Sequence, residues 1–478
     1  MGAAMGMTAQ DGTLIAAALA TLLGSPALAA DVLYVKAARV IVDPSQPALS
    51  PGALVITDGI VTAVGTNVTA PAGARQLDLG PLTVLPSFVD AHTHLAGGAP
   101  RPQPGEPTPL ATPAYAALAA QRSVASALTL GVAGMRVLGT SDFLDVAVRN
   151  AIDDGLIPGP HVIPAAHPLS IIGGHDDFSP QPYHLDPRDL YTPLYGYVAS
   201  PADAEKAVQL QIKFGARVIK LMASGGVGSP LDSPADQNLT LDEMRAAVQQ
   251  AHMHHMKVAA HSENLQATMD AMRAGVDSIE HGSELDQEAL DYMKTHNIVL
   301  VPTVNAAAGA AVPASTPPPP PGSFGASIYS RFKSQQLGPL HLASFALALK
   351  SGVTMAGGSD NAYTPGSTGI IAELLTCVEH GMTAKQAIVS ATINSAALVG
   401  LTKLGRLSSG MEGDLVAMDG DPTADIHAIE RIRVVVFKGK VIADRTRPTI
   451  AAHPPLHRRQ QERSAGIGVS GEAAYEVR

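Results

Sequence analysis

Short apolar runs alternate with helical stretches between Pro81 and Gly400. The runs are rich in β-branched residues and bounded by turn residues, which favours β-strands. We expect strands over residues 82–90, 133–138, 161–165, 217–222, 257–261, 277–280, 298–302 and 353–357. We expect helices over residues 112–130, 202–214, 241–256, 265–274, 286–295, 338–350 and 384–400. This alternation predicts a parallel α/β architecture, and eight strands in this rhythm predict a (β/α)8 TIM barrel.

The pattern differs on either side of the barrel region, where short β-like runs follow one another without helices. Asp58-Gly59 lies between two such runs and is typical of a tight hairpin turn. Short strands return after residue 402, for example over residues 434–441. We therefore expect a small β-sandwich domain built from both chain ends. The expected organisation is a segment 1–30, the β-sandwich over 31–80 and 402–450, the barrel over 81–401, and a polar tail over 451–478.

The first thirty residues contain an apolar core over residues 14–23, followed by Ala27-Leu28-Ala29. This order is typical of a secretory signal peptide, so we expect export to the periplasm or the medium. The first twelve residues carry no Lys or Arg, and a cytoplasmic protein with an N-terminal tail is the alternative. The apolar core is too short for a stable membrane span.

Composition restricts the class of protein. Hydrophobic residues make up 46% and charged residues 15%, which indicates a globular chain. The net charge of −10, the lack of a basic run and the absence of tryptophan disfavour a nucleic-acid partner. We expect a small-molecule amide or dipeptide as substrate, no nucleic acid, no membrane, and assembly as a homo-oligomer. The single cysteine, Cys377, favours a buried thiol.

Polar residues lie at the ends of several expected strands, where TIM barrels carry their chemistry. His92 and His94 are two residues apart on a strand and therefore project from the same face. Alone, such a pair is a modest signal. The other strand ends add Lys220, His261, His281 and Asp360. Taken singly, these residues could be a snorkelling lysine, core histidines and a helix cap, but together they predict a metal site.

These stretches resemble the amidohydrolase superfamily and its binuclear-metal group. The similarity covers residues 31–445 and rests on Val89-Asp90-Ala91-His92-Thr93-His94, Lys220, His261, Ser278-Ile279-Glu280-His281-Gly282 and Gly358-Ser359-Asp360. The C-terminal stretch 405–416 is also similar to the return of that family to its small β domain.

The resemblance implies two divalent metal ions, most simply Zn²⁺. It assigns His92, His94 and Asp360 to the first ion and His261 and His281 to the second. Lys220, carboxylated on its N6 atom, would bridge both ions. A bridging hydroxide would attack the substrate carbonyl, and Asp360 would carry the proton to the leaving nitrogen.

A finer resemblance is to the prolidase-like, imidazolonepropionase-related branch, which includes ochratoxin-hydrolysing amidohydrolases. It rests on residues 169–175, 220–227 and 274–282. It implies that His175 hydrogen-bonds the substrate carbonyl or its oxyanion, and that Ser224 and Gly225 line the pocket. The alternatives are a loop histidine and a flexible turn. Residues 305–335 include five successive prolines, which favour either a rigid spacer or part of a lid over the barrel.

The chain departs from this branch in one position near the expected pocket. The branch commonly has a histidine two residues after the histidine of strand five, whereas this chain has Glu263. Glu263 could repel a substrate carboxylate or bind an amino group. Related deaminases place a glutamate three residues after that histidine, so this spacing and Lys220 disfavour deamination. His252, His254 and His255 precede the same strand and are expected to be surface or packing residues.

The resulting hypothesis is a metal-dependent amidohydrolase that cleaves an amide between an acyl group and an amino acid. Dipeptides, N-acyl amino acids and ochratoxin-like amides are the candidate substrates. A cyclic amide or lactone hydrolase is one alternative. A non-catalytic binding protein on the same scaffold is another, although such a protein would be expected to have lost metal ligands.

Overall fold

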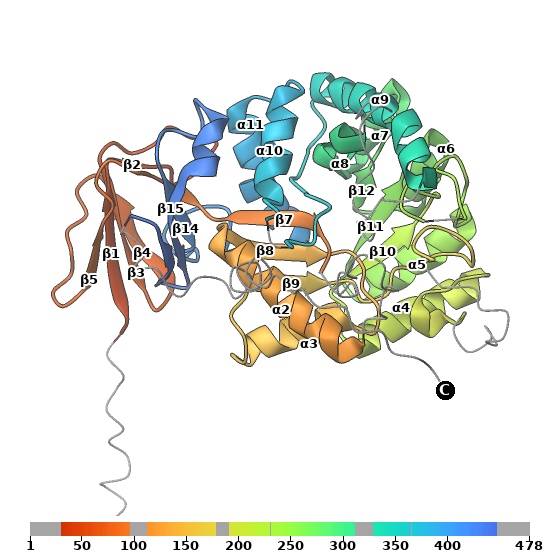
Figure 1. Ribbon diagram of the computed structural model, residues 1–478, viewed down its shortest axis with the longest axis horizontal. Coiled ribbons are helices and arrows are strands. Elements are labelled where there is room, and N and C mark those ends of the chain that lie inside the picture. Colours follow the sequence, from red (N-terminus) through yellow and green to blue (C-terminus); the bar gives the residue numbers. More distant parts are fainter. Residues whose placement is uncertain are drawn as a thin grey trace, which may run out of the picture.

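The computed structural model describes residues 30–95, 112–177, 191–229, 231–310, 328–364 and 366–446. The expected signal segment, the proline run 317–321 and the tail 451–478 lie outside these ranges, except for residue 30. Figure 1 shows two parts, with helices around a set of strands on one side and small sheets on the other. In the described part of the chain, no helix is both long and apolar enough to cross a membrane.

Seven parallel strands form most of the barrel wall. They are β7 (Phe88–Thr93), β8 (Val132–Val137), β9 (His161–Pro164), β10 (Val218–Met222), β11 (Lys257–Ser262), β12 (Ser278–His281) and β13 (Val299–Val301). They pair in the orders β7-β8-β9 and β10-β11-β12-β13. A bridge between Leu169 and Leu221 joins the two sheets. The strand positions predicted from the apolar runs are therefore confirmed for the six strands β8 to β13.

The eighth expected strand, 353–357, forms only an isolated bridge, between Met355 and Leu300. It still closes the ring, because Ala356 N–H donates to Leu300 O at 2.9 Å and Ala91 N–H donates to Gly357 O at 2.8 Å. The segment thus lies between β13 and β7. Its irregular backbone leads directly into residues 358–361, which carry Asp360 to the mouth of the barrel.

The helices lie outside the barrel strands (Figure 1). The expected ones correspond to α2 (Pro113–Thr129), α4 (Pro201–Phe214), α5 (Leu241–Met253), α6 (Leu265–Ala274), α7 (Gln287–His296), α9 (Ile328–Ser351) and the run α11 (Ala384–Val389), η3 (Ser390–Asn394) and α12 (Ser395–Val399). Side-chain caps explain why several begin where expected: Ser200, Thr240 and Asp286 each accept a backbone N–H of the first turn. The hydrophobic pattern did not predict α3 (Leu144–Asp153), α8 (Val304–Ala310), α10 (Ile370–Glu379) or the short helices η2 (Pro193–Tyr195) and η4 (Ile426–Arg431).

The first expected strand, 82–90, is in fact two strands that belong to different sheets. Residues Thr83–Pro86 form β6, which pairs antiparallel with β14 (Leu415–Met418), whereas β7 enters the barrel. At the junction, Ser87 N–H donates to Asp414 O and Phe88 N–H donates to Gly131 O. The apolar run is continuous because both strands are buried. Hydrophobicity alone therefore does not show that the chain passes from one sheet to another.

Two small sheets come from the two ends of the chain. One has the order β4-β3-β1-β5 and contains β1 (Val32–Ala37), β3 (Gly52–Thr57), β4 (Ile60–Gly65) and β5 (Arg75–Asp78). The other has the order β16-β15-β14-β6-β2 and contains β2 (Arg39–Val40), β15 (Ile432–Phe437) and β16 (Lys440–Asp444). One apolar cluster includes Leu33 and Leu54 of the first sheet and Val84 and Leu415 of the second. The predicted hairpin is present, with positive φ at Asp58 and Gly59.

Candidate metal centre

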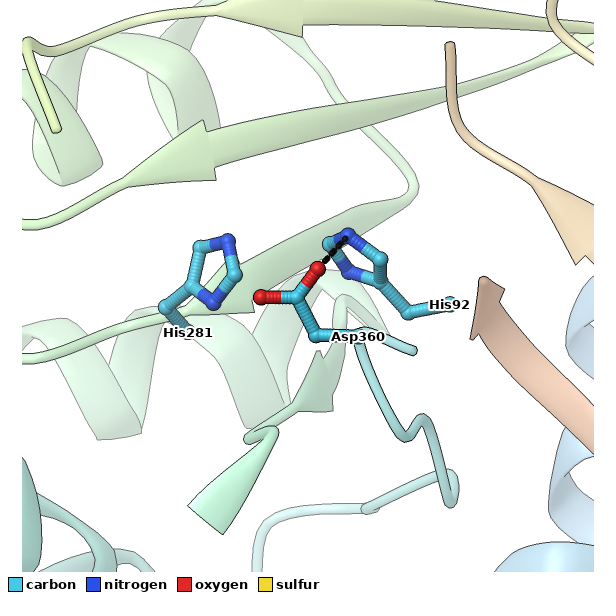
Figure 2. Close-up of side chains that lie close together, drawn as sticks. All are labelled: His92, His281 and Asp360. Carbon is cyan, nitrogen blue, oxygen red and sulfur yellow. Dashed lines mark ion pairs between the residues drawn. The ribbon is translucent and has the colours of Figure 1, made fainter. Parts of the chain in front are cut away.

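Two overlapping groups of metal-compatible side chains lie at the carboxyl ends of the barrel strands. His92, His281 and Asp360 each offer one ligand atom, and these atoms all lie within 4.8 Å of one another. Figure 2 shows the carboxylate of Asp360 between the two imidazole rings. His261, Glu263 and His281 form a second such group. Because His281 belongs to both, the two groups are adjacent.

His94 contacts the first group through Asp360. Its Nε2 lies 3.0 Å from Asp360 Oδ1, and the same oxygen lies 3.5 Å from His92 Nε2. The two histidines therefore project toward one carboxylate, as their spacing on β7 predicts. Burial raises the pKa of Asp360, but the hydrogen bond from His94 and the nearby positive charges outweigh it and hold the pKa below its usual value. Asp360 is thus ionised at neutral pH.

Lys220 projects from β10 into this set of residues and is only 2% exposed. Within the described ranges, its amino group makes no hydrogen bond and no ion pair. Burial lowers the pKa of Lys220 to about 8, partly offset by the charges of Glu280 and Asp360. A substantial fraction of this amine is therefore neutral at mildly alkaline pH, which is the form that acts as a nucleophile.

A buried carboxylate orients His92. Glu280 Oε2 lies 2.9 Å from His92 Nδ1, so Nδ1 carries the proton and Nε2 keeps a lone pair toward Asp360. Glu280 is itself held by Arg136 Nη2 at 2.8 Å and by Ser278 Oγ at 2.6 Å. Burial opposes ionisation of Glu280, but the charge of Arg136 keeps its pKa low. Glu280 is part of the resemblance motif, but the orienting role of Glu280 and Arg136 was not predicted, although charged residues inside apolar strands were the available signal.

The other two histidines also keep one nitrogen available. His261 Nε2 lies 3.2 Å from Gly225 O, to which only an N–H can donate, so Nδ1 keeps its lone pair. His281 Nδ1 pairs with Thr303 Oγ1 at 2.7 Å, which leaves Nε2. Burial lowers the pKa of both rings well below the usual value. Neutral imidazoles are the form that binds a metal ion.

The backbone at the site is unusual at two of the candidate ligand positions. Asp360 has φ 50° and His281 has φ 68°, both in the left-handed region that non-glycine residues rarely adopt. Asp90 holds the loop that carries Asp360, because its carboxylate accepts hydrogen bonds from Ser359 Oγ at 2.6 Å and Tyr363 OH at 2.7 Å. Such conformations persist only where surrounding contacts fix them.

The comparisons with known proteins agree with this geometry. A model of the amidohydrolase family matches residues 83–442. Ochratoxinase from Aspergillus niger is 33% identical over 429 residues, which are 86% of each chain. The chain belongs to the amidohydrolase family. It is therefore a hydrolase of amide bonds, as the sequence motifs predicted.

Solved structures of similar fold match most of this amidohydrolase and nearly the whole of their own chains. A Xaa-Pro dipeptidase with methionine bound in its active site is 29% identical, with a TM-score of 0.78, and the match covers 86% of this chain and 99% of that one. The crystal structure of A. niger ochratoxinase is 29% identical, with a TM-score of 0.72, and the match covers 87% and 96%. A prolidase complexed with N-methylphosphonate-L-proline is 27% identical, with a TM-score of 0.75, over 86% and 100%.

His175 lies against the second group of ligands in this amidohydrolase. Its ring stacks on that of His261, with centroids 4.0 Å apart, and its Nδ1 lies 2.6 Å from Ser229 Oγ. Gly226 permits this approach, since a Cβ there would lie 2.2 Å from His175 Cε1. Gly225 is likewise required, because a Cβ would lie 2.0 Å from Ser233 O.

The loop after β10 also fixes Ser224. Its hydroxyl donates to Gly225 O at 2.7 Å and accepts from Glu263 N–H at 2.9 Å. The single hydroxyl proton is therefore already used inside the loop. Ser224 and Gly225 lie beside His261, and their contact with substrate stays a prediction.

Glu263 lies in a chain of hydrogen bonds that depends on its charge. His341 Nε2 lies 2.6 Å from Pro302 O and so carries a proton, and burial lowers the pKa of His341 to about 4. Its bare Nδ1, 2.8 Å from Ser283 Oγ, can then accept the Ser283 proton. Ser283 Oγ donates to Glu263 Oε2 when Glu263 is a carboxylate and can accept from it when Glu263 is a neutral acid. Burial raises the pKa of Glu263 to about 8, which favours the neutral acid at neutral pH.

The histidines before β11 lie away from the centre. His252 pairs with Asp277 at 3.0 Å on the surface, and His254 lies 3.2 Å from Gln250. None of His252, His254 and His255 belongs to a metal-compatible group of the described residues. Their expected role as surface residues is consistent with these contacts.

Proposed function

We propose that this amidohydrolase holds two divalent ions and hydrolyses the amide that joins an acyl group to an amino acid. The observation that carries the proposal is the position of Lys220 relative to both groups of ligands. Its charge lowers the pKa of His92 and Asp360 on one side and of His261 and His281 on the other. One buried amine, with no hydrogen bond or ion pair to any described residue, therefore lies within electrostatic reach of every proposed ligand pair.

The donor set fits two ions. His92, His94 and Asp360 would hold the first ion, and His261 and His281 the second, with Lys220 shared. Imidazole and carboxylate donors suit Zn²⁺. Lys220 fits the shared role after its neutral amine adds to carbon dioxide and loses one proton, which gives a carbamate with two oxygen donors. When bound, such ions supply hydroxide near neutral pH and polarise a carbonyl group.

The residues of the chain would then orient the substrate and move the proton. Asp360 is ionised and can accept a proton from the attacking water and return it to the leaving nitrogen. His175 is held through Nδ1, and with Ser229 donating to Nδ1 its Nε2 would carry the proton and donate to the substrate carbonyl oxygen. A neutral Glu263 would not repel a substrate carboxylate, which removes an objection to an amino-acid leaving group.

The substrate class is supported by the relatives. One similar protein is named for ochratoxin, one is a Xaa-Pro dipeptidase with methionine in its active site, and one is a prolidase with an N-phosphonylated proline. In each of the last two, an amino acid or its derivative occupies the protein. We therefore favour release of an amino acid from a dipeptide, an N-acyl amino acid or an ochratoxin-like amide.

A hydrolysis screen tests this proposal. Purified enzyme supplied with zinc is incubated with N-acyl amino acids, dipeptides, ochratoxin A, cyclic amides and lactones, and free amino acid is quantified by mass spectrometry. We expect release from at least one of the first three classes and none by the Lys220→Ala variant. Opening of a cyclic amide or lactone, with no amino acid released, would instead establish the alternative hydrolase.

We also propose that the two small sheets form a β-sandwich, that residues 1–30 direct export, and that the enzyme is a homo-oligomer. The apolar cluster shared by the sheets supports the first proposal. N-terminal sequencing of the mature protein tests export, and light scattering after gel filtration tests assembly.

A further inference from the structure

A third group of metal-compatible side chains lies at the opposite end of the barrel strands from the site described above. His161, Glu412 and Asp414 each offer one ligand atom, and these atoms all lie within 4.8 Å of one another. His161 is the first residue of β9, so it lies at the amino end of a barrel strand. The catalytic ligands lie at the opposite, carboxyl end of the strands.

The contacts within this group leave one buried oxygen without a partner. His161 Nε2 lies 2.9 Å from Glu412 Oε2. Asp414 is 2% exposed, and its Oδ1 accepts a hydrogen bond from Lys438 N–H at 2.7 Å. Among the described residues, Asp414 Oδ2 has no hydrogen-bond partner although it is buried. A buried and unsatisfied carboxylate oxygen is costly, so it needs a ligand.

Protonation of Asp414 does not remove this cost. A proton on Oδ2 would itself need an acceptor within the described part of the chain, and Oδ2 has none within hydrogen-bond distance. No lysine forms an ion pair with either carboxylate. Among the described residues, Glu412 forms an ion pair only with His161, and Asp414 forms none. Lys438 directs its amino group over the ring of Phe437, 5.1 Å from the centroid.

We propose that His161, Glu412 and Asp414 bind a divalent metal ion of the zinc type, separate from the catalytic ions. One imidazole nitrogen and two carboxylate oxygens are ligands that zinc accepts in proteins. A dication satisfies Asp414 Oδ2 and offsets the repulsion between the two carboxylates. His161 and Glu412 are partly exposed, with 24% and 19% of their side-chain surface accessible, so the ion can enter from solvent and keep a water ligand.

The position of this group indicates a structural role. The main chain at Asp414 accepts from Ser87 N–H, at the junction where the chain passes from the five-stranded sheet into the barrel. Gly413 N–H donates to Gly59 O in the turn between β3 and β4 of the other sheet. An ion held by His161 and by residues 412 and 414 would therefore fix the barrel to both small sheets.

A measurement of the metal content per chain tests this proposal directly. Tag-free enzyme is loaded with Zn²⁺, passed through gel filtration and analysed by inductively coupled plasma mass spectrometry. We expect Asp414→Asn to contain one zinc ion fewer per chain than the unsubstituted enzyme and to keep its amide-hydrolysing activity. A chelator should lower the Tm of this variant less than it lowers the Tm of the unsubstituted enzyme, because the variant has no ion to lose at this site. His427→Ala is the matched control, because His427 also pairs with a glutamate, Glu430, at 2.7 Å but lacks the third ligand.

A second variant keeps the test decisive if Asp414→Asn fails to fold. Glu412→Gln retains the shape of the side chain and removes one donor charge, and it should also contain one zinc ion fewer. Equal zinc content in the unsubstituted enzyme, the folded variants and the His427→Ala control would overturn the proposal. Loss of all zinc together with activity would overturn it too, because the site would then not be separate.

Discussion

The Nδ1 atom of His92 lies 2.9 Å from Oε2 of Glu280, and both side chains are almost completely buried. This pair fixes which nitrogen of His92 faces the ligand group, and Arg136 in turn fixes Glu280. A histidine that binds a metal through one nitrogen commonly donates the other N–H to a carboxylate, which raises its basicity. The relationship is therefore the strongest indication within the barrel that the histidine is built to hold an ion.

The Glu280→Gln variant tests this relationship. It preserves shape but removes the charge that orients His92 and pairs with Arg136. We expect zinc affinity to fall by about 10- to 100-fold and the free energy of unfolding to fall by about 3–5 kcal/mol, because Arg136 is left as an unpaired buried charge. Zinc titration and urea unfolding measure the two effects. Glu373→Gln, at a buried carboxyl that caps α8 through Val304 and Asn305, should leave zinc affinity unchanged. Unaltered zinc affinity in Glu280→Gln would contradict the assigned role.

Lys333 is expected to position His175 without touching substrate. Its amino group donates to Gly226 O at 3.1 Å, Ser229 O at 2.8 Å and Asp232 Oδ1 at 3.1 Å, in the loop that supports His175. Lys333→Met removes these bonds, and we expect kcat/KM to fall about tenfold, or about 1.4 kcal/mol, with zinc content unchanged. Lys350→Met, near the other end of α9, is the control. Equal kinetics in both variants would show that the loop holds His175 without Lys333.

The charge of Glu263 in the pocket can be tested by substitution, because a neutral and an ionised side chain predict different effects. If Glu263 is a neutral acid that donates to Ser283, Glu263→Gln replaces one donor with another, and kcat/KM should change by less than about threefold. Glu263→His, which restores the residue common in the branch, should alter substrate preference more than metal content. A collapse of activity in Glu263→Gln, with zinc retained, would mean that the reaction needs an ionised Glu263.

The pH dependence of stability follows from His341. Burial lowers the pKa of its folded-state ring from 6.5 to about 4, so the unfolded chain binds more protons between these values. The contribution of His341 is therefore complete above pH 6.5 and is lost as the pH falls toward 4, a loss of about 3 kcal/mol. Urea unfolding at several pH values should show a shallower slope in His341→Gln. The exposed His296→Gln is the control, and equal slopes in both variants would exclude this role for His341.

The sequence pattern predicts the strand-end residues well because each lies in its own apolar run. His92, Lys220, His261 and Asp360 could be named without knowing which strands are neighbours. The partners that orient them could not, since Arg136 and Glu280 are 144 residues apart and meet only when the ring closes. The same holds for His341, which reaches Glu263 through Ser283 from the distant helix α9.

The predicted helices and strands were incomplete or wrongly bounded where the sequence has no local signal. The residues before α3 and α10, Phe143 and Gly369, form no side-chain cap, so no capping residue marks the start of either helix. The change of sheet at Ser87 depends on β14, more than three hundred residues later in the chain. Local pattern therefore predicted which strand-end residues meet at the barrel mouth, and long-range pairing determined how they are held.

The most direct test of the central claim is metal reconstitution of amide hydrolysis. The Asp414→Asn variant is used so that only ions at the barrel mouth are counted. It is stripped with a chelator and titrated with Zn²⁺ in bicarbonate buffer while amino-acid release from an active substrate is followed. We predict no activity in the stripped enzyme and a plateau at two zinc ions per chain, with neither binding nor activity in Lys220→Ala. Full activity in the metal-free enzyme, or undiminished turnover in Lys220→Ala, would contradict the account.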